Sequence, residues 1–132
     1  MNSEQVATRS ILVVDDDTEL LKALSKVLKS DGYAVTAKPD ALSAIQCIEA
    51  EDKQFDLVIT DVSMPGMRGT ALLTALKTAY PKIPVIVITA FGDWDVYAHS
   101  LREGAFEFLS KPIDKSELLA CVRRALSAKT ME

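Results

Sequence analysis

Aspartates follow two short apolar segments of the sequence. Asp15, Asp16 and Asp17 come directly after the letters ILVV, and Asp61 comes directly after LVIT. Carboxylates brought close together repel one another by several kcal/mol unless a cation lies among them. Oxygen ligands without histidine or cysteine favour Mg²⁺ over Zn²⁺. If the two segments lie side by side, we expect a Mg²⁺ site there, with one carboxylate available to attack a phosphorus atom.

A hydroxyl and an amine occupy similar positions later in the chain. Thr89 ends the apolar segment 84–89, and Lys111 follows the segment 106–109. Three carboxylates, a divalent cation and one ammonium group carry charges that nearly cancel, so a phosphoryl dianion can approach a carboxylate. Catalysis at such a site consists mostly of positioning and charge neutralisation. The four segment ends together therefore have the composition of a phosphoryl-transfer site.

These segments must be strands if they are to bring the side chains together. Short β-branched runs bounded by turn residues are typical of buried strands, and we predict five of them, at residues 11–14, 33–38, 56–60, 84–89 and 106–109. Alternation with helices predicts right-handed crossovers and a parallel sheet covered on both faces. The first, third and fourth strands are the most apolar and should be central, with the second at an edge. The expected fold is α/β, a three-layer doubly wound flavodoxin-like (βα)5 domain with strand order 2-1-3-4-5, in which ligands bind at the carboxyl ends of the strands.

Five helices are expected between and after the strands. Gly32 and Gly104 are typical helix stops, Asp40 is expected to cap the second helix, and Asp114 opens a capping-box-like start of the last one. The fourth helix is expected to begin near Trp94. The apolar residues expected to face the core are Leu20, Leu21, Leu24, Val27 and Leu28 in the first helix, Leu42, Ile45 and Ile48 in the second, Leu72, Leu73 and Leu76 in the third, and Leu118, Leu119, Val122 and Leu126 in the last.

Length and composition are those of a single globular domain. The 132 residues are 48% hydrophobic and 26% charged, with a net charge of −4, which argues against nonspecific nucleic-acid binding. We expect residues 1–9 to be a disordered leader, 10–126 the folded domain and 127–132 a tail or truncated linker. No signal peptide or membrane span is expected. Cys47 and Cys121 are expected to be reduced thiols of a cytoplasmic protein.

The motifs at the strand ends together resemble those of the receiver domain of two-component response regulators. The match includes the letters VVDD ending at Asp16, DVSMPG beginning at Asp61, TA beginning at Thr89 and KP beginning at Lys111. It covers about residues 10–126. By this resemblance Asp61 is the phosphoacceptor, Asp16 is a direct Mg²⁺ ligand and Asp15 helps through water.

The resemblance also implies the rest of the site. The backbone carbonyl of Ser63 would complete the Mg²⁺ site with Asp61, while Thr89 would hydrogen-bond the phosphoryl oxygens and Lys111 would pair with them. The peptide bond between Lys111 and Pro112 is often cis in this family, a geometry that occurs mainly before proline. Phe108 matches the switch aromatic of the family, which is often tyrosine. Because phenylalanine has no hydroxyl, its inward and outward states must differ by packing alone.

A signalling role follows from the resemblance. A histidine kinase or a histidine phosphotransfer protein would donate the phosphoryl group, and the domain would catalyse only its own phosphorylation and dephosphorylation rather than act as an enzyme. Output would pass through the fourth helix, the fifth strand and the fifth helix, which would also be the contact surface of a homodimer. In a longer chain this output would be transcription regulation, and the alternative is a single-domain phosphorelay intermediate. No direct nucleic-acid binding and no membrane association are expected.

By the same resemblance, two residues are expected to tune the lifetime of the phosphoryl group. Ser63 lies two residues after the acceptor, and Phe91 lies two residues after Thr89. A phenylalanine cannot orient a water molecule, and its ring can shield the phosphoryl group. We therefore expect slow self-dephosphorylation.

Each site residue also has a plainer interpretation when taken alone. Three aspartates after a strand are typical of a helix N-terminus, where a cap and the helix dipole favour them. Asp61 before a Pro-Gly turn can be a turn residue, and Thr89 and Lys111 can be ordinary strand-end residues. The prediction of a site therefore rests on all of them occurring together at the required strand ends.

Three other functions fit these residues less well. A phosphohydrolase of the haloacid dehalogenase type would use the D-x-D within Asp15–Asp17, but Glu19 stands where that motif has threonine or valine. A flavodoxin-like binding module would need a phosphate-binding first loop, and three aspartates there would repel a phosphate. A receiver that no longer accepts phosphate would not need the complete acceptor set.

Overall fold

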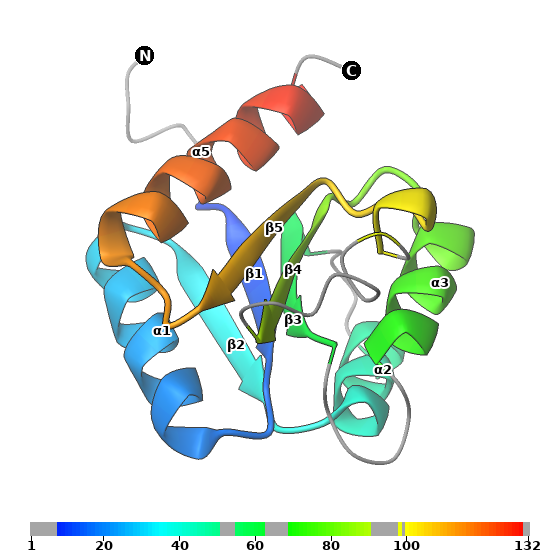
Figure 1. Ribbon diagram of the computed structural model, residues 1–132, viewed down its shortest axis with the longest axis horizontal. Helices are drawn as coiled ribbons and strands as arrows, with labels where there is room; N and C mark the ends of the chain where they lie inside the picture. Colours follow the sequence, from blue (N-terminus) through cyan, green and yellow to red (C-terminus); the bar gives the residue numbers. More distant parts are fainter. Residues whose placement is uncertain (1–7, 51–54, 63–68, 91–97, 99, 131–132) are drawn as a thin grey trace.

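The computed structural model describes residues 8–50, 55–62, 69–90, 98 and 100–130, which form alternating strands and helices (Figure 1). In chain order the elements are β1 (Ser10–Val14), α1 (Thr18–Ser30), β2 (Ala34–Lys38), α2 (Ala41–Ala50), β3 (Leu57–Asp61), α3 (Gly69–Ala79), β4 (Val85–Ala90), β5 (Glu107–Lys111) and α5 (Lys115–Thr130). Residues 98 and 100–102 are also helical, within the predicted fourth helix, whose expected start near Trp94 lies outside the described residues. Among the helices described, none has the length and apolar character needed to cross a membrane.

The five strands form one parallel sheet in the predicted order, β2-β1-β3-β4-β5. The apolar strands β1, β3 and β4 are central, and β2 and β5 form the edges. The pairing register places Val14 beside Thr60, so the residues that follow β1 lie next to the end of β3. The same edge carries the end of β4, where Ala90 lies beside Lys111 of β5. The sheet thus brings the predicted strand ends to one side of the molecule.

Alternate residues of the central strands face two layers of core. In β1, Ile11 and Val13 belong to the cluster that includes α1 and α5, whereas Leu12 and Val14 belong to the cluster that includes α2 and α3. Figure 1 shows the same division, with α1 and α5 on one side of the sheet and α2 and α3 on the other. A sheet covered on both faces needs strands that are apolar throughout, which explains the continuous apolar runs in the sequence.

The helix boundaries follow the predicted caps and stops. Asp40 Oδ1 accepts a hydrogen bond from the Ser43 backbone N–H at 2.7 Å, and this bond lowers the pKa of the Asp40 carboxyl. Asp114 Oδ2 accepts one from the Glu117 backbone N–H at 2.9 Å. Two predicted stops have positive φ, a conformation that favours glycine: Gly32 (97°) and Gly104 (100°).

The predicted inner face of α2 is partly wrong. Leu42 is 60% exposed, whereas Ala41, Ala44 and Ile48 are buried and Ile45 packs at the border of the core. Successive helical residues point about 100° apart, so a face centred on Ala41 and Ala44 turns Leu42 toward solvent. The prediction put Leu42 on the inner face because it relied on large apolar residues, and alanine gives only a weak hydrophobic signal.

The inner residues predicted for α5 are buried, and this helix continues to Thr130. Both cysteines are free: Cys47 is half-buried and Cys121 is buried. Burial, together with the nearby Glu107 carboxylate, raises the pKa of the Cys121 thiol to about 12. Cys121 is therefore an unreactive core residue in the native state.

Candidate functional site

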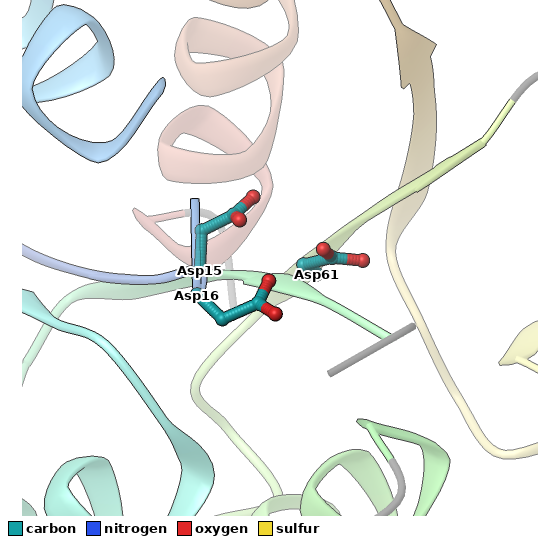
Figure 2. A group of neighbouring side chains, drawn as sticks. All are labelled: Asp15, Asp16 and Asp61. Carbon is teal, nitrogen blue, oxygen red and sulfur yellow. The ribbon is translucent and has the colours of Figure 1, made fainter. Parts of the chain in front are cut away.

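Three carboxylates meet at the carboxyl edge of the sheet (Figure 2). Asp15 and Asp16 follow β1, Asp61 is the last residue of β3, and each offers an oxygen within 4.8 Å of those of the other two. Asp15 is 0% exposed and Asp61 2%, whereas Asp16 is exposed to solvent. Repulsion between charges grows as they leave water. The cluster therefore needs positive charge close by.

Lys111 supplies part of that charge from the end of β5. Its Nζ donates a hydrogen bond to Asp61 Oδ2 at 2.9 Å and lies 3.4 Å from Asp15 Oδ2. β4 separates β3 from β5, so the lysine side chain reaches across the end of β4 to meet both carboxylates. The peptide bond that follows, Lys111–Pro112, is cis, as the family resemblance implies.

Burial and hydrogen bonding have opposing effects on the pKa values of Asp15 and Lys111. Burial raises the pKa of the Asp15 carboxyl, and the hydrogen bond from Asp17 opposes this without cancelling it. Burial acts to lower the pKa of the Lys111 amine, but the hydrogen bond to Asp61 and the charges of Asp61 and Asp15 outweigh it and raise that pKa. Lys111 is therefore protonated, while burial makes the charged form of the Asp15 carboxyl less favourable than it is in water.

The start of α1 orients Asp15. The Asp17 backbone N–H donates to Asp15 Oδ1 at 2.8 Å, while the Asp17 side chain caps the helix by accepting from the N–H groups of Glu19 and Leu20. Asp17 thus has the plain capping role that its position suggests, and its backbone also holds a site carboxylate. This contact was not predicted, because an aspartate run does not reveal which backbone N–H each carboxylate accepts.

Thr89 lies near the end of β4 and is 3% exposed. Its Oγ1 is buried and has no hydrogen-bond partner among the described residues. An unpaired buried hydroxyl costs free energy unless a ligand or another group meets it.

Phe108 in β5 is half-buried and packs against the cluster that includes α2 and α3. Two residues predicted to set phosphoryl lifetime, Ser63 and Phe91, lie outside the described residues.

The donor set fits a small hard cation. Over the described part of the chain, Asp15, Asp16 and Asp61 are the one cluster of acidic, histidine or cysteine side chains close enough to share an ion. Asp15 Oδ2 is buried and makes no hydrogen bond to any described residue, although it lies at ion-pair distance from Lys111. Carboxylate oxygens with one member open to solvent suit Mg²⁺, which retains several of its waters.

The curated relatives of the chain include a response regulator and a transcriptional regulator. The chain is 40% identical over 114 residues to the response regulator protein FleR of Pseudomonas aeruginosa and 36% identical over 117 residues to the DNA-binding transcriptional regulator NtrC of Escherichia coli K12. These alignments cover 86% and 89% of this chain but 24% of each relative. The chain thus spans about a quarter of the length of these two proteins.

Solved structures agree with the sequence relatives. A signal receiver domain of an HD domain-containing protein from Pseudomonas fluorescens Pf-5 superposes with a TM-score of 0.89 at 32% identity, covering 96% of this chain and all of that one. A response regulator receiver domain protein from Clostridium thermocellum gives a TM-score of 0.88 at 31% identity, covering 93% of this chain and 98% of that one. The family model of the response regulator receiver domain matches residues 11–123. With the acidic cluster, the lysine and the strand order all in place, the chain belongs to the response regulator receiver family.

Proposed function

We propose that this domain takes a phosphoryl group from a phosphohistidine onto Asp61. The observation that carries the proposal is the ammonium group of Lys111, 2.9 Å from a buried Asp61 oxygen within a cluster of three carboxylates. A carboxylate oxygen of Asp61 would attack the phosphorus as the phosphorus–nitrogen bond of the donor breaks. The electron pair of that bond goes to the imidazole of the donor, and the product is an acyl phosphate on Asp61.

The neighbouring residues would position the phosphoryl group and neutralise its negative charge. Lys111 would pair with a phosphoryl oxygen, and the Thr89 hydroxyl would donate a hydrogen bond to another, satisfying a buried group that has no partner among the described residues. Mg²⁺, held by Asp15, Asp16, Asp61 and the backbone carbonyl of Ser63, would offset negative charge on the transferred group. Asp15 would act through water, as the family resemblance implies.

The donor would be a histidine kinase or a histidine phosphotransfer protein, as the family assignment supports. The domain would catalyse only its own phosphorylation and dephosphorylation, in the cytoplasm. The named relatives are a transcriptional regulator and a response regulator of about four times the aligned length. We therefore propose transcription regulation as the output of the whole protein, with a single-domain phosphorelay intermediate as the alternative.

Phosphorylation would be read out through Thr89 and Phe108. The two residues lie on neighbouring strands, Thr89 beside Ser110 and Phe108 beside Val87. Movement of the Thr89 hydroxyl toward a phosphoryl group would open space for the Phe108 ring, and the surface of the fourth helix, β5 and α5 would change with it. Backbone NMR shifts with and without beryllium fluoride test this. Unchanged shifts in β5 and α5 would contradict it.

Phosphoryl lifetime is proposed to depend on Phe91 and Ser63, which flank the site in sequence. Shielding by the Phe91 ring would slow hydrolysis. Loss of phosphate from Phe91→Glu and Phe91→Ala should then be faster than from the unmodified protein. Unchanged or slower loss from both variants would count against shielding.

The central experiment is incubation with Mg²⁺ and acetyl phosphate, followed by intact mass. The unmodified protein should gain one phosphoryl group, Asp61→Asn should gain none, and EDTA should abolish the gain. Asp31→Asn, which alters an exposed carboxylate paired with Arg123, is the matched control and should behave as the unmodified protein. Size-exclusion chromatography of the same samples reports whether phosphorylation produces a homodimer.

Equal phosphorylation of Asp61→Asn would overturn the assignment of the acceptor. Steady turnover of phosphate esters that is lost in Asp15→Asn but retained in Asp61→Asn would instead favour the phosphohydrolase. These outcomes separate the functions because Asp15 would be the nucleophile in one and a Mg²⁺ residue in the other.

A further inference from the structure

An open groove of about 730 Å³ lies between α1 and the edge strand β2, and the proposed phosphotransfer does not use it. Lys22, Lys26 and Lys29 line its α1 wall, and Ala37 lies on its β2 wall. No carboxylate belongs to the lining, as far as the described residues show. A basic groove contrasts with a chain whose net charge is −4.

The three lysines form one flank of α1. All three are exposed, and none forms an ion pair with any residue in the described part of the chain. The opposite flank carries Leu20 and Val27, which pack against the core that α1 shares with α5. α1 therefore presents a positive, unpaired flank on the side of β2. Charges of one sign gathered along a groove attract a partner of the opposite sign.

The β2 edge adds a row of backbone groups to the groove. Among the described strands β2 pairs only with β1, and the hydrogen bonds of the Ala34 N–H and the Lys38 carbonyl run toward β1. In a parallel ladder alternate residues bond to one neighbour, so the N–H and C=O groups of Val35 and Ala37 point to the open edge. The Val35 side chain packs on the α1 side of the sheet. An extended chain placed beside β2 would thus have backbone partners and lie along the lysines.

We propose that this groove docks an acidic peptide segment of a partner protein, added as an extended strand to the edge of β2. Side chains on one face of a strand repeat about every 6.6 Å. Lys22 and Lys26 are one helical turn apart, about 6 Å along the axis, and Lys29 lies about 4.5 Å further on. Acidic residues at alternate positions of the segment would therefore meet successive lysines while the backbone pairs with Val35 and Ala37.

The probe is a fluorescent peptide of alternating glutamate and threonine, titrated with the full chain and followed by anisotropy. Binding should weaken as salt rises. A peptide with the same composition but with its glutamates in one block should bind at least about fivefold more weakly, since only the alternating form places every charge on one face. Equal binding of the two would overturn strand addition.

Backbone methylation tests strand pairing without altering the protein. The methyl groups can be placed on the odd-numbered or on the even-numbered amides of the peptide, which gives two phases. Only one phase blocks the N–H groups that face β2. One phase should abolish binding and the other should retain it, with NMR shifts at the Val35 and Ala37 amides in the retained case. Equal effects of both phases would contradict the proposal.

Charge reversal tests the groove itself. Lys22→Glu combined with Lys26→Glu should weaken peptide binding at least about tenfold, whereas Lys82→Glu combined with Lys115→Glu, at exposed sites outside the groove, should not. Phosphorylation by acetyl phosphate should be unchanged in both pairs, which verifies folding. Peptide binding that survives in the groove variant would overturn the proposal. Tighter, lysine-dependent binding of an RNA oligonucleotide or of anionic vesicles would also overturn it, because the partner would then be of another class.

Discussion

At the scale of single residues, the site is a balance between buried negative charge and one lysine. Asp15 and Asp61 are almost fully buried, and Lys111 is the cation within ion-pair distance of both among the described residues. Among the described residues, three carboxylates face one ammonium group, and two of these carboxylates are buried, so negative charge is in excess there. This excess destabilises the metal-free domain and provides the attraction for a divalent cation.

Asp15 should therefore lower the stability of the metal-free protein. Burial raises the pKa of its carboxyl above the ordinary value of 3.8, so the native state binds its proton more tightly than the unfolded chain does. The free energy of unfolding then falls as pH rises above 3.8, and the loss is complete above the native-state pKa. Asp15→Asn avoids this loss and should be more stable than the unmodified protein at pH 7 in EDTA.

Urea denaturation at pH 7 and at pH 3 measures this effect. The advantage of Asp15→Asn should vanish at the lower pH, where the carboxyl is protonated in both states. Asp16→Asn is the control, because Asp16 is exposed and its replacement should change stability by less than about 0.5 kcal/mol. A metal-free Asp15→Asn protein less stable than the unmodified one at pH 7 would show that its hydrogen bond and ion pair outweigh desolvation.

The two thiols should differ in reactivity. Cys121 is buried and its pKa is raised to about 12, whereas Cys47 is half-buried. Iodoacetamide at pH 8 should therefore modify Cys47 first and leave Cys121 unmodified until the protein unfolds. Peptide mass mapping over time, with Cys47→Ser as control, gives the order. Native-state labelling of Cys121 as fast as that of Cys47 would contradict its burial.

At the scale of elements, the sequence predicted the strands better than the helix faces. Strands buried on both faces are continuous apolar runs, and the aspartate, threonine and lysine that end them mark the site edge. In α2, by contrast, alanines carry much of the buried face and the large Leu42 does not. The hydrogen bond from Asp17 to Asp15 was also beyond sequence reasoning, since it depends on the local turn. The roles of Ser63 and Phe91 came from the family resemblance alone.

The orientation of α2 can be tested with a matched pair of substitutions. Leu42→Ala should lower the free energy of unfolding by less than about 0.5 kcal/mol, because this side chain is 60% exposed. Ile48→Ala should lower it by about 2–4 kcal/mol, because that side chain is buried against the sheet and leaves a cavity. Urea denaturation of both variants measures the difference. Similar losses in the two would support the face predicted from sequence instead.

At the scale of the whole molecule, the strand order couples the site to folding. Residues 15 and 61 are distant in the chain and become neighbours only because β3 pairs with β1, and Lys111 joins them only because β5 follows β4 in the sheet. Alternation of strands and helices, together with the apolar character of the first, third and fourth strands, predicted this order, since right-handed crossovers leave few arrangements. The unfolded chain cannot assemble the cluster. Any ion that binds it therefore binds the native state alone.

Mg²⁺ should consequently stabilise the whole domain. A ligand that binds the native state alone adds about 2.7 kcal/mol at a hundred times its dissociation constant, which for a domain of this size raises Tm by about 10 °C. Thermal unfolding in a Mg²⁺ titration measures the shift.

Asp16→Asn and Asp61→Asn should largely abolish this Tm shift, since each removes a ligand from the cluster. Lys111→Met should reach the same shift at lower Mg²⁺, because a competing positive charge 2.9 Å from Asp61 is gone. A full shift that persists in Asp61→Asn would place the ion elsewhere and remove the basis for the site.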